Sequence, residues 1–167
     1  MRGDLTNTDT NPKTTEENAV FFCRFWNRFC LQHHAETASW KNRSEIMHQI
    51  GTVLYVLWGL LHLLAAFQVF KLGSSQKPGM VQGRIYQNAW NLAYFAIFVV
   101  VIAVVYNWKN SPLGYWLNLV TASITDIGFI LFILVPGYLP LRPGILGPAL
   151  WILAIVFSTL GIMMTTS

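Results

Sequence analysis

Residues 50–70 read IGTVLYVLWGLLHLLAAFQVF, a run of 21 residues without a formally charged side chain. Three other stretches match it in length and composition, residues 87–106, 115–135 and 145–165, and Asp126 is the one charged residue among them. An α-helix rises about 1.5 Å per residue, so each stretch spans roughly the 30 Å of a bilayer's hydrocarbon core. Lipid offers the backbone no hydrogen-bond partner, so the spanning form must be helical. We therefore predict an all-α integral membrane protein, a bundle of four transmembrane helices.

Composition and charge placement favour the same class. Of the 167 residues, 54% are hydrophobic and 11% are charged, against about a quarter charged in soluble domains. Beyond residue 45 the basic residues lie between or at the ends of the apolar runs: Lys71, Lys77, Arg84, Lys109 and Arg142. This spacing is typical of headgroup anchors and lacks the clustered basic surface that phosphate backbones require. We expect the lipid bilayer as a partner and no nucleic acid.

The chain divides into three predicted parts. Residues 1–14 form a disordered polar tail, residues 15–45 an amphipathic interfacial helix with its linker, and residues 46–167 the four-helix bundle. Within 15–34, aromatic side chains recur at helical spacing opposite basic ones: Phe22, Phe25, Trp26 and Phe29. Such a helix lies on the bilayer surface or packs against the bundle or a partner membrane protein.

Orientation depends on the basic residues beside each helix. The side that holds both termini and the opposite side carry four such residues each, so these charges show no bias. Counting the whole tail gives seven on the terminal side against four. This count favours both termini in the cytoplasm, and we expect the protein in the plasma (inner) membrane.

Polar and small residues inside the spans follow helical stripes. The first span carries one at 4-3-4-3-4 spacing, the geometry of a helix face directed at its neighbours: His48, Thr52, Tyr55, Gly59, His62 and Ala66. The second carries an arc of polar residues: Arg84, Gln87, Asn88 and Asn91. The fourth carries a small-residue seam suited to close helix contact: Gly147, Ala154, Ser158 and Gly161.

Three of these polar positions lie at similar depths. Counted from the membrane face that carries the first loop, His62 lies about 12 Å deep, Asn91 about 10 Å and Asp126 about 15 Å. Equal depth permits the three to meet in one layer near the midplane, and the rotation of each helix decides whether they do.

Asp126 is the most informative residue because it is the only acid after Glu45. A carboxylate within the membrane costs several kcal/mol unless it is neutral or paired. One interpretation is a carboxylate that handles protons or binds a ligand. The other is a hydrogen-bonded strut that ties helices together.

The sequence contains no complete motif for binding a haem or a metal ion. A haem in a four-helix bundle needs paired histidines on facing helices, whereas no histidine follows His62. Cys23 and Cys30 precede His33 and His34, but this spacing matches no zinc motif. Haem and zinc are therefore disfavoured, the cofactor is unknown and no metal ligand is assigned. No nucleophile–base pair, phosphate-binding loop or other catalytic motif occurs, which argues against an enzyme without deciding the question.

The sequence leaves three functions open. The first is a binding or accessory subunit with a mid-bilayer polar pocket for a lipid-like or quinone-like molecule, and its candidate ligand-binding residues are His62, Arg84, Gln87, Asn88, Asn91 and Asp126. The second is a membrane-embedded oxidoreductase or proton-relay component. The third is a structural subunit of a membrane complex. No catalytic residue is assigned in any of them.

Overall fold

The computed structural model describes the backbone of residues 12–166 and the side chains of residues 40–165. It divides into two compact units, Met1–Trp40 and Lys41–Ser167, and the second unit holds the bundle. The predicted polar tail and the amphipathic face of residues 15–34 lie outside the described side chains. Both stay predictions.

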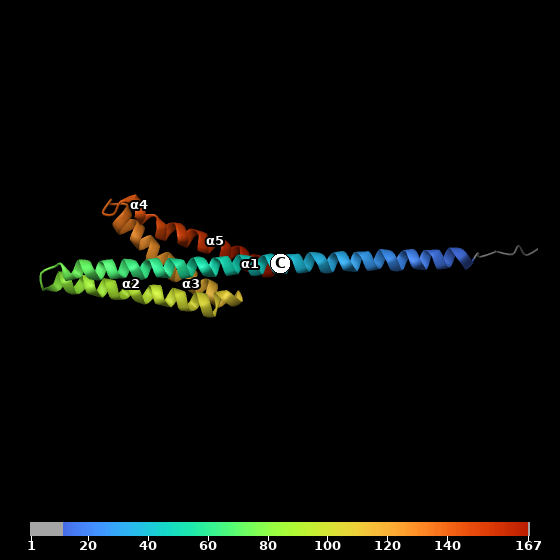
Figure 1. Ribbon diagram of the computed structural model, residues 1–167, viewed down its shortest axis with the longest axis horizontal. Helices are drawn as coiled ribbons and strands as arrows, with labels where there is room; N and C mark the ends of the chain where they lie inside the picture. Colours follow the sequence, from blue (N-terminus) through green and yellow to red (C-terminus); the bar gives the residue numbers. More distant parts are fainter. Residues whose placement is uncertain (1–11, 167) are drawn as a thin grey trace, which may run out of the picture. The chain divides into compact units, whose positions relative to one another are not determined.

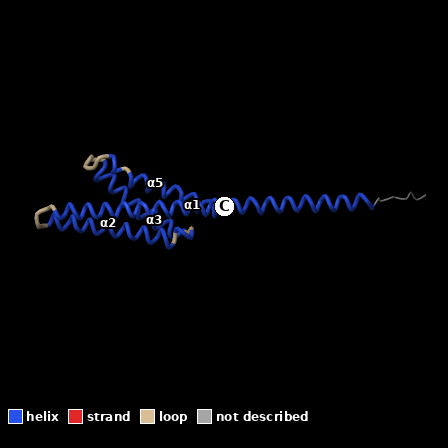
Figure 2. The backbone as a smooth tube through the Cα atoms, viewed as in Figure 1, coloured by secondary structure: helices blue, strands red, loops and turns tan. Residues whose placement is uncertain are grey.

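Within the described backbone all regular structure is helical (Figures 1 and 2). The main helices are α1 (Pro12–Ser74), α2 (Met80–Val105), α3 (Pro112–Phe129), α4 (Leu141–Gly144) and α5 (Leu146–Thr166). A 3₁₀ turn, η1 (Asn107–Lys109), precedes α3, and a π-helical segment, η2 (Ile130–Leu134), follows it. Four segments are long and apolar enough to cross a membrane: Trp40–Ser74, Met80–Lys109, Pro112–Leu134 and Leu141–Thr165. The predicted fold class, an all-α membrane protein with a four-helix bundle, is confirmed.

The helices run past the predicted spans. The stretch predicted at 50–70 continues to Ser74, and the one predicted to begin at residue 87 begins at Met80. Apolar composition marks only the part of a helix that lies in hydrocarbon, whereas helical hydrogen bonding continues through the polar headgroup region. The first loop is correspondingly short.

The turn between α2 and α3 is built from residues with special backbone preferences. Asn110 has φ +53°, a left-handed conformation that asparagine tolerates better than most residues. Pro112 occupies the first turn of α3, where its missing N–H leaves no hydrogen bond unmade. Gly137, with φ +76°, turns the chain between η2 and α4.

Glycines bring α1 close to two other helices. A Cβ at Gly161 of α5 would lie 3.0 Å from the backbone nitrogen of His48. A Cβ at Gly59 of α1 would lie 3.0 Å from the carbonyl oxygen of Ala96 in α2. Distances this short leave no room for a side chain, so the helices meet backbone to backbone.

The core of the bundle is small and its surface is apolar. The fully buried cluster comprises Tyr55, Trp58, Val99, Ala103, Ala122 and Ala154. Large apolar side chains point outward instead, among them Leu64 with 65% and Phe132 with 73% of its surface exposed. Apolar surface on this scale requires lipid or protein around it.

Candidate functional site

The predicted stripe on α1 does face the bundle. His48, Thr52, Tyr55, Gly59, His62 and Ala66 are all buried. Trp58 joins them on the same side of α1 and is completely buried as well. The predicted direction of this face is confirmed, and two of its side chains, Trp58 and His62, contact Asp126.

His62 and Asp126 come together, as their equal depth permits. His62 Nε2 lies 3.7 Å from Asp126 Oδ1. The Asp126 side chain is completely buried, and its Oδ1 atom has no hydrogen-bond partner. An unpartnered carboxyl oxygen of this kind is costly in an apolar interior, so it marks a chemically unusual position.

Trp58 contacts both members of the pair. Its Nε1–H donates a 2.5 Å hydrogen bond to Asp126 Oδ2. Its ring stacks on the His62 imidazole with the ring centroids 3.8 Å apart and the planes at 27°. Trp58 therefore holds the carboxyl group by a hydrogen bond and packs its ring against the imidazole.

A backbone contact fixes which His62 nitrogen carries a hydrogen. His62 Nδ1 lies 2.9 Å from the carbonyl oxygen of Trp58. A carbonyl oxygen only accepts hydrogen bonds, so Nδ1 must donate. Nε2 is then the nitrogen that can gain or lose a proton, and it is the nitrogen that faces Asp126.

Two further features surround the pair. A Cβ at Gly147 in α5 would lie 3.3 Å from His62 Cε1 and 3.4 Å from Asp126 Oδ1, so α5 packs directly against both side chains. The π-helical segment η2 begins one turn after Asp126. Interruptions of this type occur frequently at functional sites.

The candidate residues on α2 are not part of this cluster. Arg84, Gln87, Asn88 and Asn91 are all exposed on the bundle. Arg84 Nη1 donates a 2.9 Å hydrogen bond to Gln87 Oε1 on the next turn. Asn91 therefore lies at a depth similar to that of the His62–Asp126 pair, but its side chain points away from the pair. The face of α2 that points into the bundle carries small residues, including Ala89 and Ala96.

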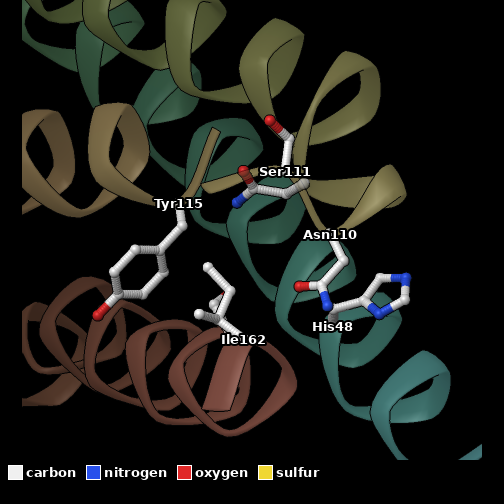
Figure 3. A pocket seen from close by; sticks show the side chains of 7 residues that line it. His48, Asn110, Ser111, Tyr115 and Ile162 are labelled. Carbon is white, nitrogen blue, oxygen red and sulfur yellow. The ribbon is translucent and has the colours of Figure 1, made fainter. Parts of the chain in front are cut away.

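A second group of polar side chains is buried near the α2–α3 turn. A cavity of about 10 Å³ lies there, and Figure 3 shows side chains from α1, the α2–α3 turn, α3 and α5 around it. Its lining comprises His48, Asn107, Asn110, Ser111, Tyr115, Ser158 and Ile162. Asn107 and Ser158 are buried, and their side-chain polar atoms have no partner. The cavity has about the volume of one water molecule, and Ile162 lines it together with the polar side chains.

Among the described side chains, no three histidine, cysteine, aspartate or glutamate residues come together as metal ligands. Cys23, Cys30, His33 and His34 lie outside the described side chains. Their disfavoured zinc interpretation stays a prediction.

Sequence reasoning assigned neither Trp58, nor Asn118, nor the cluster near the α2–α3 turn to a site. In the sequence, Trp58 looks like an ordinary apolar core residue. Only its hydrogen bond to Asp126, which forms in the tertiary structure, distinguishes it. Asn118 was visible as a polar residue within the third span, and it lies two turns from Asp126 on the same side of α3. This spacing is the signal that places both residues on one face of the helix.

The fold and the site together define an integral membrane helical bundle with a buried histidine–aspartate pair. Comparison of the chain with protein-family models, with curated proteins and with solved structures finds no match.

Proposed function

We propose that this protein binds and releases protons within the membrane at the His62–Asp126 pair, as a proton-relay component. The observation that carries the proposal is the free, buried Oδ1 of Asp126, 3.7 Å from His62 Nε2.

Simple electrostatics requires a proton between these two groups. If Nε2 were bare and Asp126 ionised, two lone pairs would face each other in an apolar site. One proton, either on Asp126 or on Nε2, removes that repulsion and leaves the pair with no net charge. Its loss leaves one negative charge within the membrane, at a cost of several kcal/mol. The pair therefore binds one proton firmly and releases it when that charge is compensated or when the pH is raised.

Proton transfer within the pair needs a small movement. The O–H bond of Asp126 breaks as the N–H bond at His62 Nε2 forms, and the reverse step returns the proton. At 3.7 Å the two atoms are beyond direct hydrogen-bond distance. They must approach each other, or one water molecule must bridge them.

Close packing disfavours a large ligand at this position. A quinone-sized or lipid-sized molecule needs roughly 300 Å³ or more, and the packing of α5 against the pair at Gly147 favours a proton or a water molecule there instead. A pocket for such a ligand is the second candidate function. The exposed Arg84–Gln87 hydrogen bond favours it, since that polar surface of α2 can contact a lipid headgroup.

A difference titration tests the proton proposal. Purified wild-type protein and the Asp126→Asn variant, both in lipid bilayers, are titrated between about pH 4 and pH 10, the range that brackets ordinary carboxyl and imidazole groups. We expect the wild type to release about one more proton per chain, because asparagine has nearly the same shape but cannot ionise.

Folding controls accompany the titration. Asp126→Asn should retain wild-type thermal stability within about 1 kcal/mol, the usual scale of interhelical hydrogen bonds in membranes. Asp126→Leu, which removes the hydrogen bond from Trp58, should be less stable than Asp126→Asn. If the wild type and Asp126→Asn release equal numbers of protons while both are folded, Asp126 is a strut and the proposal is wrong.

A further inference from the structure

Six buried polar atoms without partners lie on the η1 side of Asp126. Together with Asp126 Oδ1, they are all the buried side-chain nitrogen and oxygen atoms among the described residues that have no hydrogen-bond partner. The six atoms belong to four side chains: Tyr55 Oη, Asn107 Oδ1 and Nδ2, Asn118 Oδ1 and Nδ2, and Ser158 Oγ. Tyr55 and Asn118 are completely buried, and Asn107 and Ser158 are 5% exposed. Buried polar groups in folded proteins nearly always have a partner, either protein or ordered water.

Helix contacts show that these groups occupy adjacent levels. The register of the helices follows from three contacts, namely Gly51 with Ser158, Gly114 with Asn107, and Tyr115 Oη with Thr159 Oγ1 at 3.1 Å. In this register Asn107, Ser158 and Asn118 lie on successive levels about 3 Å apart. This axial spacing is close to the length of one hydrogen bond to a water molecule.

The cavity beside Asn107 and Ser158 is the first position for such a water. It measures about 10 Å³, and both polar side chains and the apolar Ile162 line it, from α1, the α2–α3 turn, α3 and α5 (Figure 3). An internal water commonly makes about three hydrogen bonds to buried groups that lack other partners. The unpartnered Asn107 amide and Ser158 hydroxyl meet this requirement.

We propose that Asn107, Ser158 and Asn118 bind a short chain of internal water molecules, and that protons reach the His62–Asp126 pair from this end of the bundle. The second part of the inference rests on the proposed function. The one-sided distribution of the unpartnered atoms supports it. On the opposite side of the pair, Gly144 packs against the apolar side chains of Leu134 and Leu139.

A dry layer separates the water chain from the pair. Asn118 and Asp126 are eight residues apart on α3, about 12 Å along the helix axis. The completely buried methyl groups of Ala122 and Ala154 lie at the levels between them. About four hydrogen-bond steps are needed to cross this distance. Water must enter this layer for a proton to pass, so the layer limits the rate of exchange.

Water-to-protein magnetisation transfer in solid-state NMR tests the water chain. The full-length protein, labelled with ¹⁵N at asparagine and tryptophan, is measured in bilayers, and the Asn118→Leu variant assigns the Asn118 signal. We expect the side-chain amides of Asn107 and Asn118 to receive magnetisation nearly as fast as that of Asn42, which is exposed and precedes the predicted span 50–70. The Trp58 indole, beyond the dry layer, should receive it slowly. If Asn118 is as slow as Trp58, the water chain does not exist.

Exchange at Trp58 tests the route. After transfer into D₂O, Asn118→Leu should slow the loss of the Trp58 Nε1 proton about tenfold, the factor that matches one hydrogen bond of ordinary net strength. The control Thr125→Val removes a hydroxyl group that bonds within α3, to the Thr121 carbonyl oxygen, and should leave the rate unchanged. Unchanged exchange in Asn118→Leu would refute the route. The difference titration of Asp126 separately decides the proposed function, so the two can fail independently.

Discussion

The contact between α1 and α5 makes Gly51→Ala a sensitive test of the helix packing. A Cβ at position 51 would lie 2.9 Å from the backbone nitrogen of Ser158 and 3.2 Å from its Cα. Ordinary contacts between heavy atoms lie at about 3.5–4.0 Å. Backbone atoms cannot rotate out of the way, so α5 must retreat locally by roughly 0.5–1 Å, and packing along the seam loses a quarter to a half of its contact energy.

The expected magnitude follows from two opposing effects. Overpacking of this kind costs about 1–3 kcal/mol, whereas replacing a helical glycine by alanine contributes up to about 1 kcal/mol of helix propensity. We therefore expect Gly51→Ala to lower the free energy of unfolding by about 1–2 kcal/mol. The matched control is Gly128→Ala in α3, because a Cβ there meets no atom within 4 Å. It should be neutral or slightly stabilising.

Both variants can be measured by unfolding in mixed micelles with increasing denaturing detergent, followed by far-ultraviolet circular dichroism. Equal stability of Gly51→Ala and Gly128→Ala would refute the close α1–α5 contact. It would also remove the helix register from which the levels of Ser158 and Asn118 were derived.

Two other predictions concern the membrane. The first uses single cysteines in a chain in which Cys23 and Cys30 are replaced by serine. Because four spans place both termini on one side of the bilayer, cysteines at positions 8, 109 and 167 should react with an impermeant thiol reagent from that side, and a cysteine at position 77 from the other. Labelling of positions 8 and 167 from opposite sides would contradict this topology. The second uses a peptide of residues 15–34, which should become helical on anionic vesicles, with a blue shift of Trp26 fluorescence. The driving force is the burial of large aromatic side chains, which contributes about 1.5–3 kcal/mol each. If neither signal changes, the aromatic face contacts protein instead of lipid.

Much of the fold could be predicted from the sequence because it follows from local rules. The chain has four apolar stretches long enough to span a bilayer, and in lipid each must be helical because its backbone finds no other hydrogen-bond partner. These rules predict four helices whatever their arrangement in the bundle. The same reasoning singled out Asp126, since a carboxylate within an apolar span is costly unless it is neutral or paired, and its presence there can be read from the sequence. The inward stripe on α1 was also predictable, because helical periodicity defines one face of a helix.

Which polar residues meet was decided only by the tertiary structure. Asn91 and Asn118 are both asparagines within apolar spans, yet Asn91 is exposed and Asn118 is completely buried. Periodicity gives the relative positions of residues around one helix but not the rotation of that helix in the bundle. That rotation depends on close contacts between helices, such as Gly59 against Ala96. The hydrogen bond from Trp58 to Asp126 joins residues 68 positions apart, and packing alone brings them together.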